Sequence, residues 1–177
     1  MRALVVYESM FGNTQAIASA VADGLAGRMD VDLVEIAEAP VRVDADLVVA
    51  GGPTHAFSMS RPSTRQSALE QADGRELVSH GRGLREWLED AGPALRGMSV
   101  ATFDTKITKG HLPGSAARSA QKRLRRFGAR VVSRAHSFSV QGTAGPLGDG
   151  ELARARAWGA ELAAVCGGAD PVPADNR

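Results

Sequence analysis

A short polar segment near the N-terminus has the residue types of an anion-binding site. Residues 8–14 read ESMFGNT, with hydroxyl groups at Ser9 and Thr14. An apolar run precedes them and apolar residues four apart follow, so a strand should lead through this segment into a helix. Free N–H groups at a helix start bind anions together with nearby hydroxyls, and Asn13 or Thr14 could cap the helix. An ordinary capped helix start is the alternative interpretation.

The composition of this segment excludes several phosphate-binding motifs. It has no Lys or Arg, so it is not a Walker A loop, and it lacks the three-glycine dinucleotide turn. A neutral nest of hydroxyl and amide groups suits a terminal phosphate monoester. A receiver domain needs an Asp at the end of the third strand, where this chain has the residues Ala50-Gly51-Gly52-Pro53.

The elements that must position this segment follow from hydrophobic periodicity. Several apolar runs are continuous, as in strands that are buried on both faces. Amphipathic stripes between them predict helices that cover the sheet. This alternation indicates a parallel sheet with right-handed crossovers. The expected strands are residues 3–7, 31–36, 46–51, 98–103 and 130–140. Three later helical stripes are expected: Leu84, Trp87, Leu88 and Ala91; Ala117, Ala120, Leu124 and Phe127; and Leu152, Ala155, Gly159, Leu162 and Cys166.

An open parallel sheet binds ligands beyond the carboxyl ends of its strands. Three loops should meet there, at residues 8–14, 53–62 and 104–115. The connection from 53 to 97 is longer than a crossover needs, and Pro62 could open a short helix that ends near Ala72. Long connections often act as lids or binding segments, whereas a mobile surface loop is the alternative.

Four segments, taken in order, resemble the flavodoxin family. ESMFGNT resembles the loop that holds the FMN phosphate, and GGPTHAFSM (residues 51–59) is similar to the second flavin loop. Residues 103–132 resemble the third flavin loop with its helix and the last strand, and residues 145–162 resemble the final helix. The resemblance implies an α/β fold, an open five-stranded parallel sheet of order 2-1-3-4-5 with helices on both faces. It also implies FMN and electron transfer.

The same resemblance assigns the site residues in three groups. The first group would hold the phosphate, the second would contact the isoalloxazine ring, and the third would close its other side. The groups are Ser9, Met10, Phe11, Gly12, Asn13 and Thr14; Pro53, Thr54, His55, Ala56 and Phe57; and Phe103, Asp104, Thr105, Lys106 and Gly110. The resemblance implies neither a metal nor a catalytic residue.

Some features depart from the family pattern. Electron-transfer flavodoxins are usually acidic and clamp the flavin between Trp and Tyr, whereas this chain has a pI of about 8.0. The stacking candidates are Phe57, His55 and His111, and Lys106 and Lys109 lie in the third loop. A basic run at residues 118–130 predicts a solvated helix face. A patch for an acidic redox partner or a nucleotide phosphate is the alternative.

The bulk properties bound the remaining functions. The chain has 177 residues and one cysteine. Because its net charge is only +1, neither nucleic acid nor a membrane is an expected partner. We expect one domain over residues 1–166 with an insertion at about 57–83, a disordered tail at 167–177 and a cytoplasmic location. An FMN-binding electron-transfer protein is the leading prediction, acting on a redox partner protein or small-molecule acceptor as a monomer or homodimer. An NAD(P)H-dependent FMN reductase of quinones or small molecules and a flavin-free interaction module are the alternatives.

Overall fold

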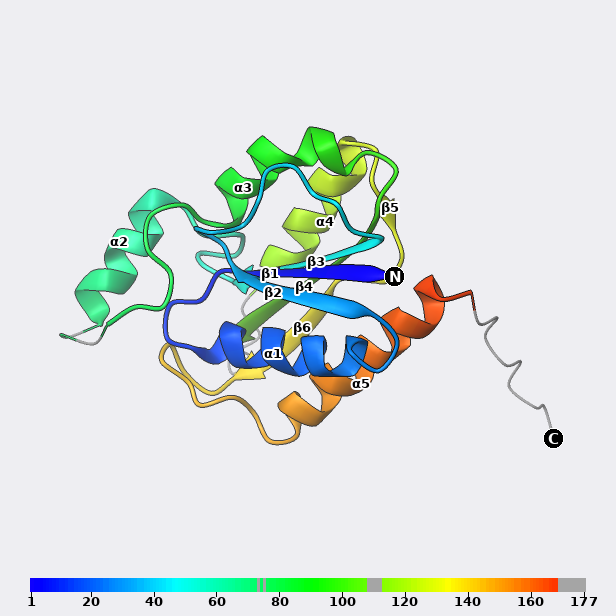
Figure 1. The fold of residues 1–177 in the computed structure, drawn as a ribbon. Coiled ribbons are helices and arrows are strands. Elements are labelled where there is room, and N and C mark those ends of the chain that lie inside the picture. Colours follow the sequence, from blue (N-terminus) through cyan, green and yellow to red (C-terminus); the bar gives the residue numbers. More distant parts are fainter. Residues whose placement is uncertain (73, 75, 108–112, 169–177) are drawn as a thin grey trace.

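The computed structural model describes residues 1–72, 74, 76–107 and 113–168, and it contains a twisted parallel sheet. The strand order is β2-β1-β3-β4-β5, and β6 also pairs with β4 (Figure 1). This order confirms the predicted 2-1-3-4-5 topology. The strands are β1 (Arg2–Tyr7), β2 (Asp30–Glu35), β3 (Leu47–Pro53), β4 (Ser99–Ile107), β5 (Arg130–Val131) and β6 (His136–Val140).

The fifth position of the sheet holds two short strands where one continuous strand was expected. Both β5 and β6 pair with β4 in parallel, one beside its start and the other beside its end. Between them, Ser133 faces the helices: its carbonyl oxygen accepts from Gln121 Nε2 at 2.8 Å, and its hydroxyl accepts from Trp158 Nε1 at 3.1 Å. The N–H of Val132 still donates to the carbonyl oxygen of Val100 at 3.0 Å, and the side-chain bonds replace the ladder at Ser133.

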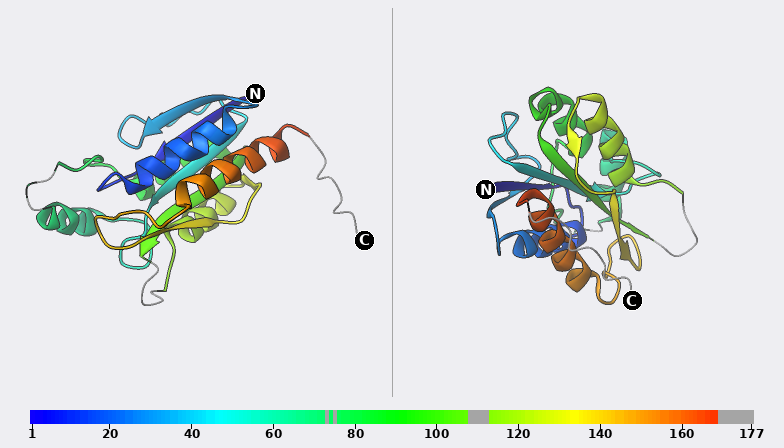
Figure 2. Two further views of the ribbon diagram at one scale, coloured as in Figure 1. Left: turned by 90° about the horizontal axis from the view of Figure 1, so that it is seen from below. Right: turned by 90° about the vertical axis from the view of Figure 1, so that its right-hand side faces the viewer.

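Helices cover both faces of the sheet. α1 (Asn13–Leu25) and α5 (Glu151–Cys166) lie side by side on one face, and α3 (Leu84–Ala91), a 3₁₀ turn (Gly92–Leu95) and α4 (Ala116–Arg126) lie on the other (Figures 1 and 2). The expected stripe of α5 is partly wrong, because Leu152 is 48% exposed and Trp158 packs in the core instead. Within the described residues, no helix is both long enough and apolar enough to cross a membrane.

One further helix lies away from these two layers. α2 (Pro62–Gln71) begins at the predicted proline and stands beyond the carboxyl ends of the strands (Figure 1). Only Ala68 of this helix is buried, in a small cluster with Met10 and Leu77. α2 therefore packs against the 8–14 segment and not against the sheet.

The close crossing of α1 and α5 depends on glycine. A Cβ atom at Gly159 would collide with the carbonyl oxygen of Val21, and one at Gly24 would collide with that of Arg156. Gly159→Ala should therefore lower the free energy of unfolding by about 1–3 kcal/mol, the usual cost of overpacking. Urea denaturation measures this, with Gly27→Ala as the control, since a Cβ there meets nothing within 4 Å. Equal stability of the Gly159→Ala variant and the wild type would contradict this packing.

Candidate functional site

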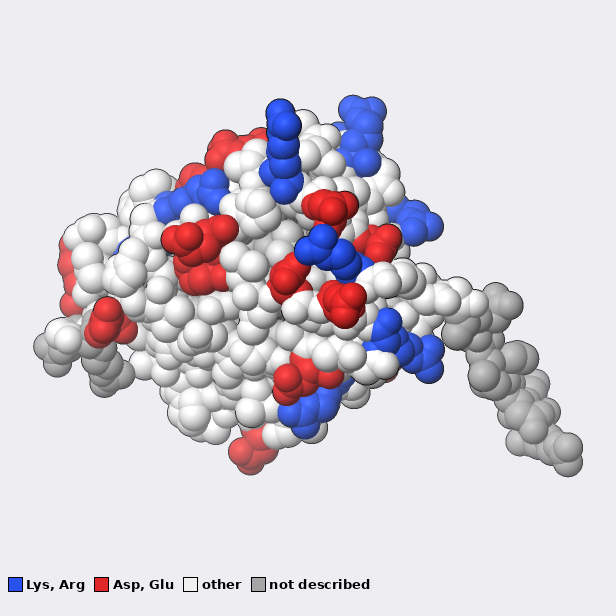
Figure 3. Space-filling model, in the orientation of Figure 1, with Lys and Arg blue, Asp and Glu red and all other residues white. Residues whose placement is uncertain are grey.

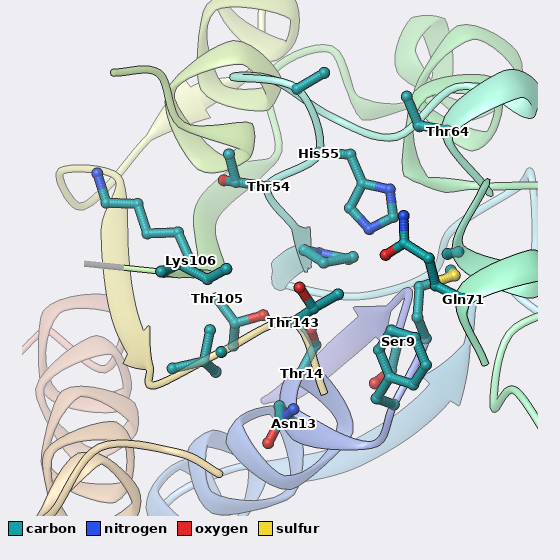
Figure 4. Close-up of a pocket in the computed structure, with 18 of the residues that line it drawn as sticks. Ser9, Asn13, Thr14, Thr54, His55, Thr64, Gln71, Thr105, Lys106 and Thr143 are labelled. Carbon is teal, nitrogen blue, oxygen red and sulfur yellow. Dashed lines mark hydrogen bonds between the residues drawn. The ribbon is translucent and has the colours of Figure 1, made fainter. Parts of the chain in front are cut away.

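A cavity of about 330 Å³ opens at the carboxyl edge of the sheet. Its wall comes from the 8–14 segment, the 53–57 segment, α2, the end of β4 and residues 140–143 (Figure 4). A second cavity of about 230 Å³ adjoins it through Thr54, Ala56, Lys106 and Ile107, and its wall adds Phe57 and Gly114. The three loops expected to converge therefore do so over the residues that the structure describes, and they bring most of the predicted site residues together.

The 8–14 segment forms a nest of free N–H groups. Gly12 has φ of 86°, a left-handed conformation that favours glycine, and its N–H donates to Ser9 Oγ at 3.1 Å. α1 starts at Asn13, and Gly12 is its N-cap, without a capping side chain. The expectation that Asn13 or Thr14 caps the helix is wrong, because both already belong to its first turn. Within the described residues, the N–H groups of residues 13–15 have no acceptor.

Hydroxyl groups surround this nest. Thr14 Oγ1 and Thr105 Oγ1 are 2.7 Å apart, which ties the start of α1 to the end of β4. Both residues line the cavity, together with Ser9 and Thr143. Figure 4 shows these side chains beside the first turn of α1. The hydroxyls of Ser9 and Thr14 and the N–H groups of the nest form a group of donors without Lys or Arg, and Thr105 holds the Thr14 hydroxyl from the side of β4.

The 53–57 segment carries backbone strain at the cavity edge. Ala56 and Phe57 have φ of 44° and 72°, which costs about 1–3 kcal/mol for each non-glycine residue. The turn is closed by His55 and Ser58, whose backbone groups pair at 2.8 and 3.0 Å. Phe57 is 55% exposed, so its ring is available to a ligand. Strain of this kind is typical of segments that are shaped for binding.

His55 presents an imidazole to the cavity. Its side chain and that of Gln71 point toward one another across the space (Figure 4). Burial, reinforced by the charge of Arg65, lowers the pKa of His55 below its ordinary value. The ring is therefore neutral at pH 7 and offers one donor and one acceptor.

Two predicted site residues lie behind the cavity and not in its wall. Phe103 is fully buried and packs edge-on against Phe138 at 6.2 Å between ring centroids. Asp104 is also fully buried, and its Oδ2 accepts from Thr54 Oγ1 at 3.0 Å, from Ser115 Oγ at 2.5 Å and from Ala117 N at 2.9 Å. Asp104 thus fixes the 53–57 segment to the start of α4.

The remaining predicted residues are placed as follows. Met10, Phe11, Asn13, Pro53 and Lys106 line the main cavity, whereas Gly12 shapes the loop without lining it. The predicted Gly110, with the candidates Lys109 and His111, lies outside the described residues.

The sequence interpretation missed the contribution of α2. Thr64, Ser67 and Gln71 recur along one side of this helix and line the cavity. The helix buries only Ala68, so its sequence has no amphipathic stripe that could reveal which side faces inward. The short segment after β6, with Gly142 and Thr143, was also missed, because nothing in its composition separates it from an ordinary loop.

A buried carboxylate anchors the long connection to the 8–14 segment. Glu8 is fully buried; its Oε2 accepts from Leu84 N at 2.8 Å, and its Oε1 accepts from Ser60 Oγ at 2.5 Å. Arg65 donates to the same Ser60 hydroxyl at 2.9 Å and pairs with Glu86 at 3.1 Å. Burial raises the pKa of Glu8 above its ordinary value, although these bonds and the charge of Arg65 oppose the shift. Through this network α2 and α3 are held beside the cavity.

A metal centre is absent from the part of the chain that the structure describes, because no three His, Cys, Asp or Glu residues there could hold an ion together. Cys166 is half-buried on α5, and burial raises the pKa of its thiol, which keeps it protonated at neutral pH.

Comparisons with known proteins agree with this architecture. The family model described as flavodoxin matches residues 5–158. A flavodoxin from the domain Archaea superposes with a TM-score of 0.67 at 21% identity, over 94% of this chain and 99% of that one. The Streptococcus pneumonia TIGR4 flavodoxin gives a TM-score of 0.66 at 22% identity, over 93% of this chain and 99% of that one. Oxidised Flavodoxin 1 from Bacillus cereus gives a TM-score of 0.63 at 18% identity, over 92% of this chain and 97% of that one. The comparison with curated proteins finds no match. Because the family model spans most of the sequence and the strand order agrees with it, this chain belongs to the flavodoxin family.

Proposed function

We propose that the two adjoining cavities bind FMN and that the protein transfers electrons through it. The observation that carries this proposal is the nest at residues 9–14, where free N–H groups and hydroxyls meet without any Lys or Arg. A phosphate dianion placed there would gain from the helix dipole and from charge-assisted hydrogen bonds. The bound flavin would supply reversible uptake of electrons.

The chain's own residues fit the rest of such a ligand. The second cavity lies between Phe57 and Lys106, away from the nest, which leaves room for a ring system at that end. Lys106 lines both cavities while its Nζ donates to the carbonyl oxygen of Gly114 at 3.4 Å. Its ammonium group would place a positive charge beside a ring that receives electrons. Asp104 would keep Thr54 in position from behind.

Phe57→Ala should weaken binding of FMN and riboflavin to the same extent. An aromatic stack contributes about 0.5–1.5 kcal/mol beyond its buried area, and it acts on the ring that both flavins share. Flavin fluorescence quenching measures both affinities. Phe11→Ala is the matched control, because that phenylalanine borders the nest and lies in the main cavity only. A loss confined to FMN would contradict the assignment of Phe57 to the ring.

One observation favours a second candidate, a reductase of small molecules. The polar side of α2 and the neutral His55 add hydrogen-bonding groups to the main cavity that the flavodoxin motifs do not require. Sustained consumption of NADPH in the presence of a quinone would support the reductase. Electron transfer to a partner protein without such turnover would support the carrier.

The proposal as a whole is tested by the absorption spectrum of the purified chain after incubation with FMN. We expect the bands of a bound flavin, and FMN as the flavin released on denaturation. A chain that takes up no flavin would contradict the proposal and favour an interaction module.

A single domain over residues 1–166, a cytoplasmic location and a monomer or homodimer remain part of the proposal, supported by the lone cysteine and the family's fold.

A further inference from the structure

A hollow of about 530 Å³, separate from the two adjoining cavities described above, lies at the far edge of the sheet. It is bordered by α4, the segment between β5 and β6, the start of β6 and the first turns of α5. Figure 2 shows α4 and α5 on either side of this edge, with β6 between them. His136 at one end of β6 lines this hollow, and Val140 at the other end lines the main cavity, called the flavin cavity below. The two sites are therefore separate and about 13 Å apart along the strand.

The lining of this hollow is basic. Arg118, Lys122 and Arg125 project from α4, and Arg134 and Arg154 face them from the segment before β6 and from α5. No acidic residue belongs to the lining that the structure describes. The basic run of α4, expected to be a solvated face, thus meets two arginines from distant parts of the chain.

Among the residues that the structure describes, most of these cations find no counterion. The ion pairs formed by the described residues include none with Arg118, Lys122, Arg125 or Arg134. Other basic side chains are paired, as Arg123 is with Glu89. On the face shown in Figure 3, basic side chains likewise lie among acidic ones. Like charges that share a hollow repel one another, so this arrangement favours a bound anion.

Part of the hollow is already fixed in place. Arg154 pairs with Glu151, donates to the carbonyl oxygen of Ser137 at 2.6 Å and lies 4.6 Å above the ring of Phe138. Gln121, at the floor, is buried and bonded to Ser133. Arg154 thus forms a fixed wall of the hollow, because its Nε and Nη2 groups already donate to Glu151 and Ser137 and its charge is balanced by Glu151. The exposed cations of α4 can close around a ligand that lies against this wall.

The shape and composition favour a small anion over a macromolecule. The volume falls in the range of small-ligand sites, about 300–1,000 Å³. The described lining residues include no Trp, Tyr or Phe, the aromatic anchors that are typical of protein interfaces and that stack on single-stranded nucleic acid. Arginine recognises phosphate oxygens in pairs, so several arginines suit a group with more than one phosphate.

We propose that this hollow binds a polyphosphate group, as in inorganic pyrophosphate or the diphosphate of a nucleotide. The site does not depend on flavin binding, because it shares no lining residue with the flavin cavity. Arg118, Lys122, Arg125 and Arg134, which form no ion pair with the residues that the structure describes, would neutralise the diphosphate, and Arg154 would supply a fixed wall beside it.

The test is calorimetric titration of inorganic pyrophosphate into the full chain loaded with one equivalent of FMN, so that the nest at residues 9–14 is filled. We expect one site whose affinity falls severalfold between about 50 and 200 mM salt, because the charges are exposed. The double variant Arg125→Glu with Arg134→Glu should bind at least about tenfold more weakly. The single variant Arg125→Glu should already weaken binding severalfold. Its matched control is Arg126→Glu, a change of equal charge on the same helix outside the hollow, which should change the affinity by less than about twofold.

Several outcomes would overturn the proposal. These are no binding of pyrophosphate, an unchanged affinity of the double variant for pyrophosphate, and a loss of affinity in Arg126→Glu that equals the loss in Arg125→Glu. Binding of polyglutamate without pyrophosphate would instead indicate an acidic protein partner. Tighter binding of ADP than of pyrophosphate, with no binding of adenosine, would identify a nucleotide as the source, and equal binding would identify the inorganic anion. If the chain fails to take up FMN, the same titrations on the flavin-free chain still separate the hollow from the nest, because only the hollow contains Arg125 and Arg134.

Discussion

Glu8→Ala is expected to lower the free energy of unfolding by about 3 kcal/mol or more. The substitution removes the acceptor for the N–H of Leu84 and for the hydroxyl of Ser60, both inside a fully buried network. A buried polar group left without its partner costs about 1–3 kcal/mol, and here both the N–H of Leu84 and the hydroxyl of Ser60 lose their acceptor. Urea denaturation at neutral pH measures the loss. A change below about 1 kcal/mol would show that the network contributes little.

Glu8→Gln separates the charge of this residue from its hydrogen bonds. The amide oxygen can still accept from Leu84, and the amide N–H can donate to Ser60 Oγ, so we expect a much smaller loss than for Glu8→Ala. Burial raises the pKa of Glu8 in the folded protein. Just above the carboxyl's ordinary pKa of 4.5, the folded protein therefore keeps a proton that the unfolded chain has lost.

This difference fixes the sign of the pH dependence. The folded state binds more protons in that window, so Glu8 makes stability fall as pH rises from 4.5 toward the raised pKa. The stability of Glu8→Gln relative to the wild type should therefore increase over the same window. Glu38→Gln, at an exposed carboxyl, is the matched control and should stay parallel to the wild type. A parallel curve for Glu8→Gln as well would contradict the raised pKa of this buried carboxyl.

The fold could be predicted from the sequence because its signals are local. Strands buried on both faces appear as continuous apolar runs, and the covering helices carry amphipathic stripes, so element order and sheet class follow. The break between β5 and β6 could not be predicted, since it depends on bonds from Gln121 and Trp158 to Ser133. Those donors come from two helices that only the folded chain brings to this strand.

The candidate site could be predicted only where a loop carries a motif. The 8–14 and 53–57 segments follow strand ends, and their side chains do line the cavity. The polar side of α2 was missed because a helix with one buried residue has no periodic pattern. The burial of Glu8 was missed because its partners, Ser60 and Leu84, are distant in sequence. The basic hollow was seen only as a charge run, because Arg134 and Arg154 join α4 through tertiary structure alone.

The nest at residues 9–14 should make FMN bind at least about 100-fold more tightly than riboflavin, which lacks the phosphate. A factor of 100 corresponds to about 2.8 kcal/mol, which one or two charge-assisted hydrogen bonds supply. The donors for it are the free N–H groups at the start of α1 and the Thr14 hydroxyl.

Two valine substitutions separate the nest from the rest of the site. Thr14→Val removes a hydroxyl of the nest, and Thr105→Val removes the partner of that hydroxyl across a 2.7 Å bond. Both variants lose the same internal hydrogen bond, so they should lose similar stability. Only Thr14→Val should reduce the ratio of FMN to riboflavin affinity, by about tenfold.

The measurement that tests the central claim most directly is calorimetric titration of the flavin-free protein with FMN and, separately, with riboflavin. If the nest holds the phosphate, FMN binds at least about 100-fold more tightly in the wild type, and the ratio falls in Thr14→Val but not in Thr105→Val. Equal affinity of the wild type for the two flavins would contradict the assignment of this nest to the FMN phosphate.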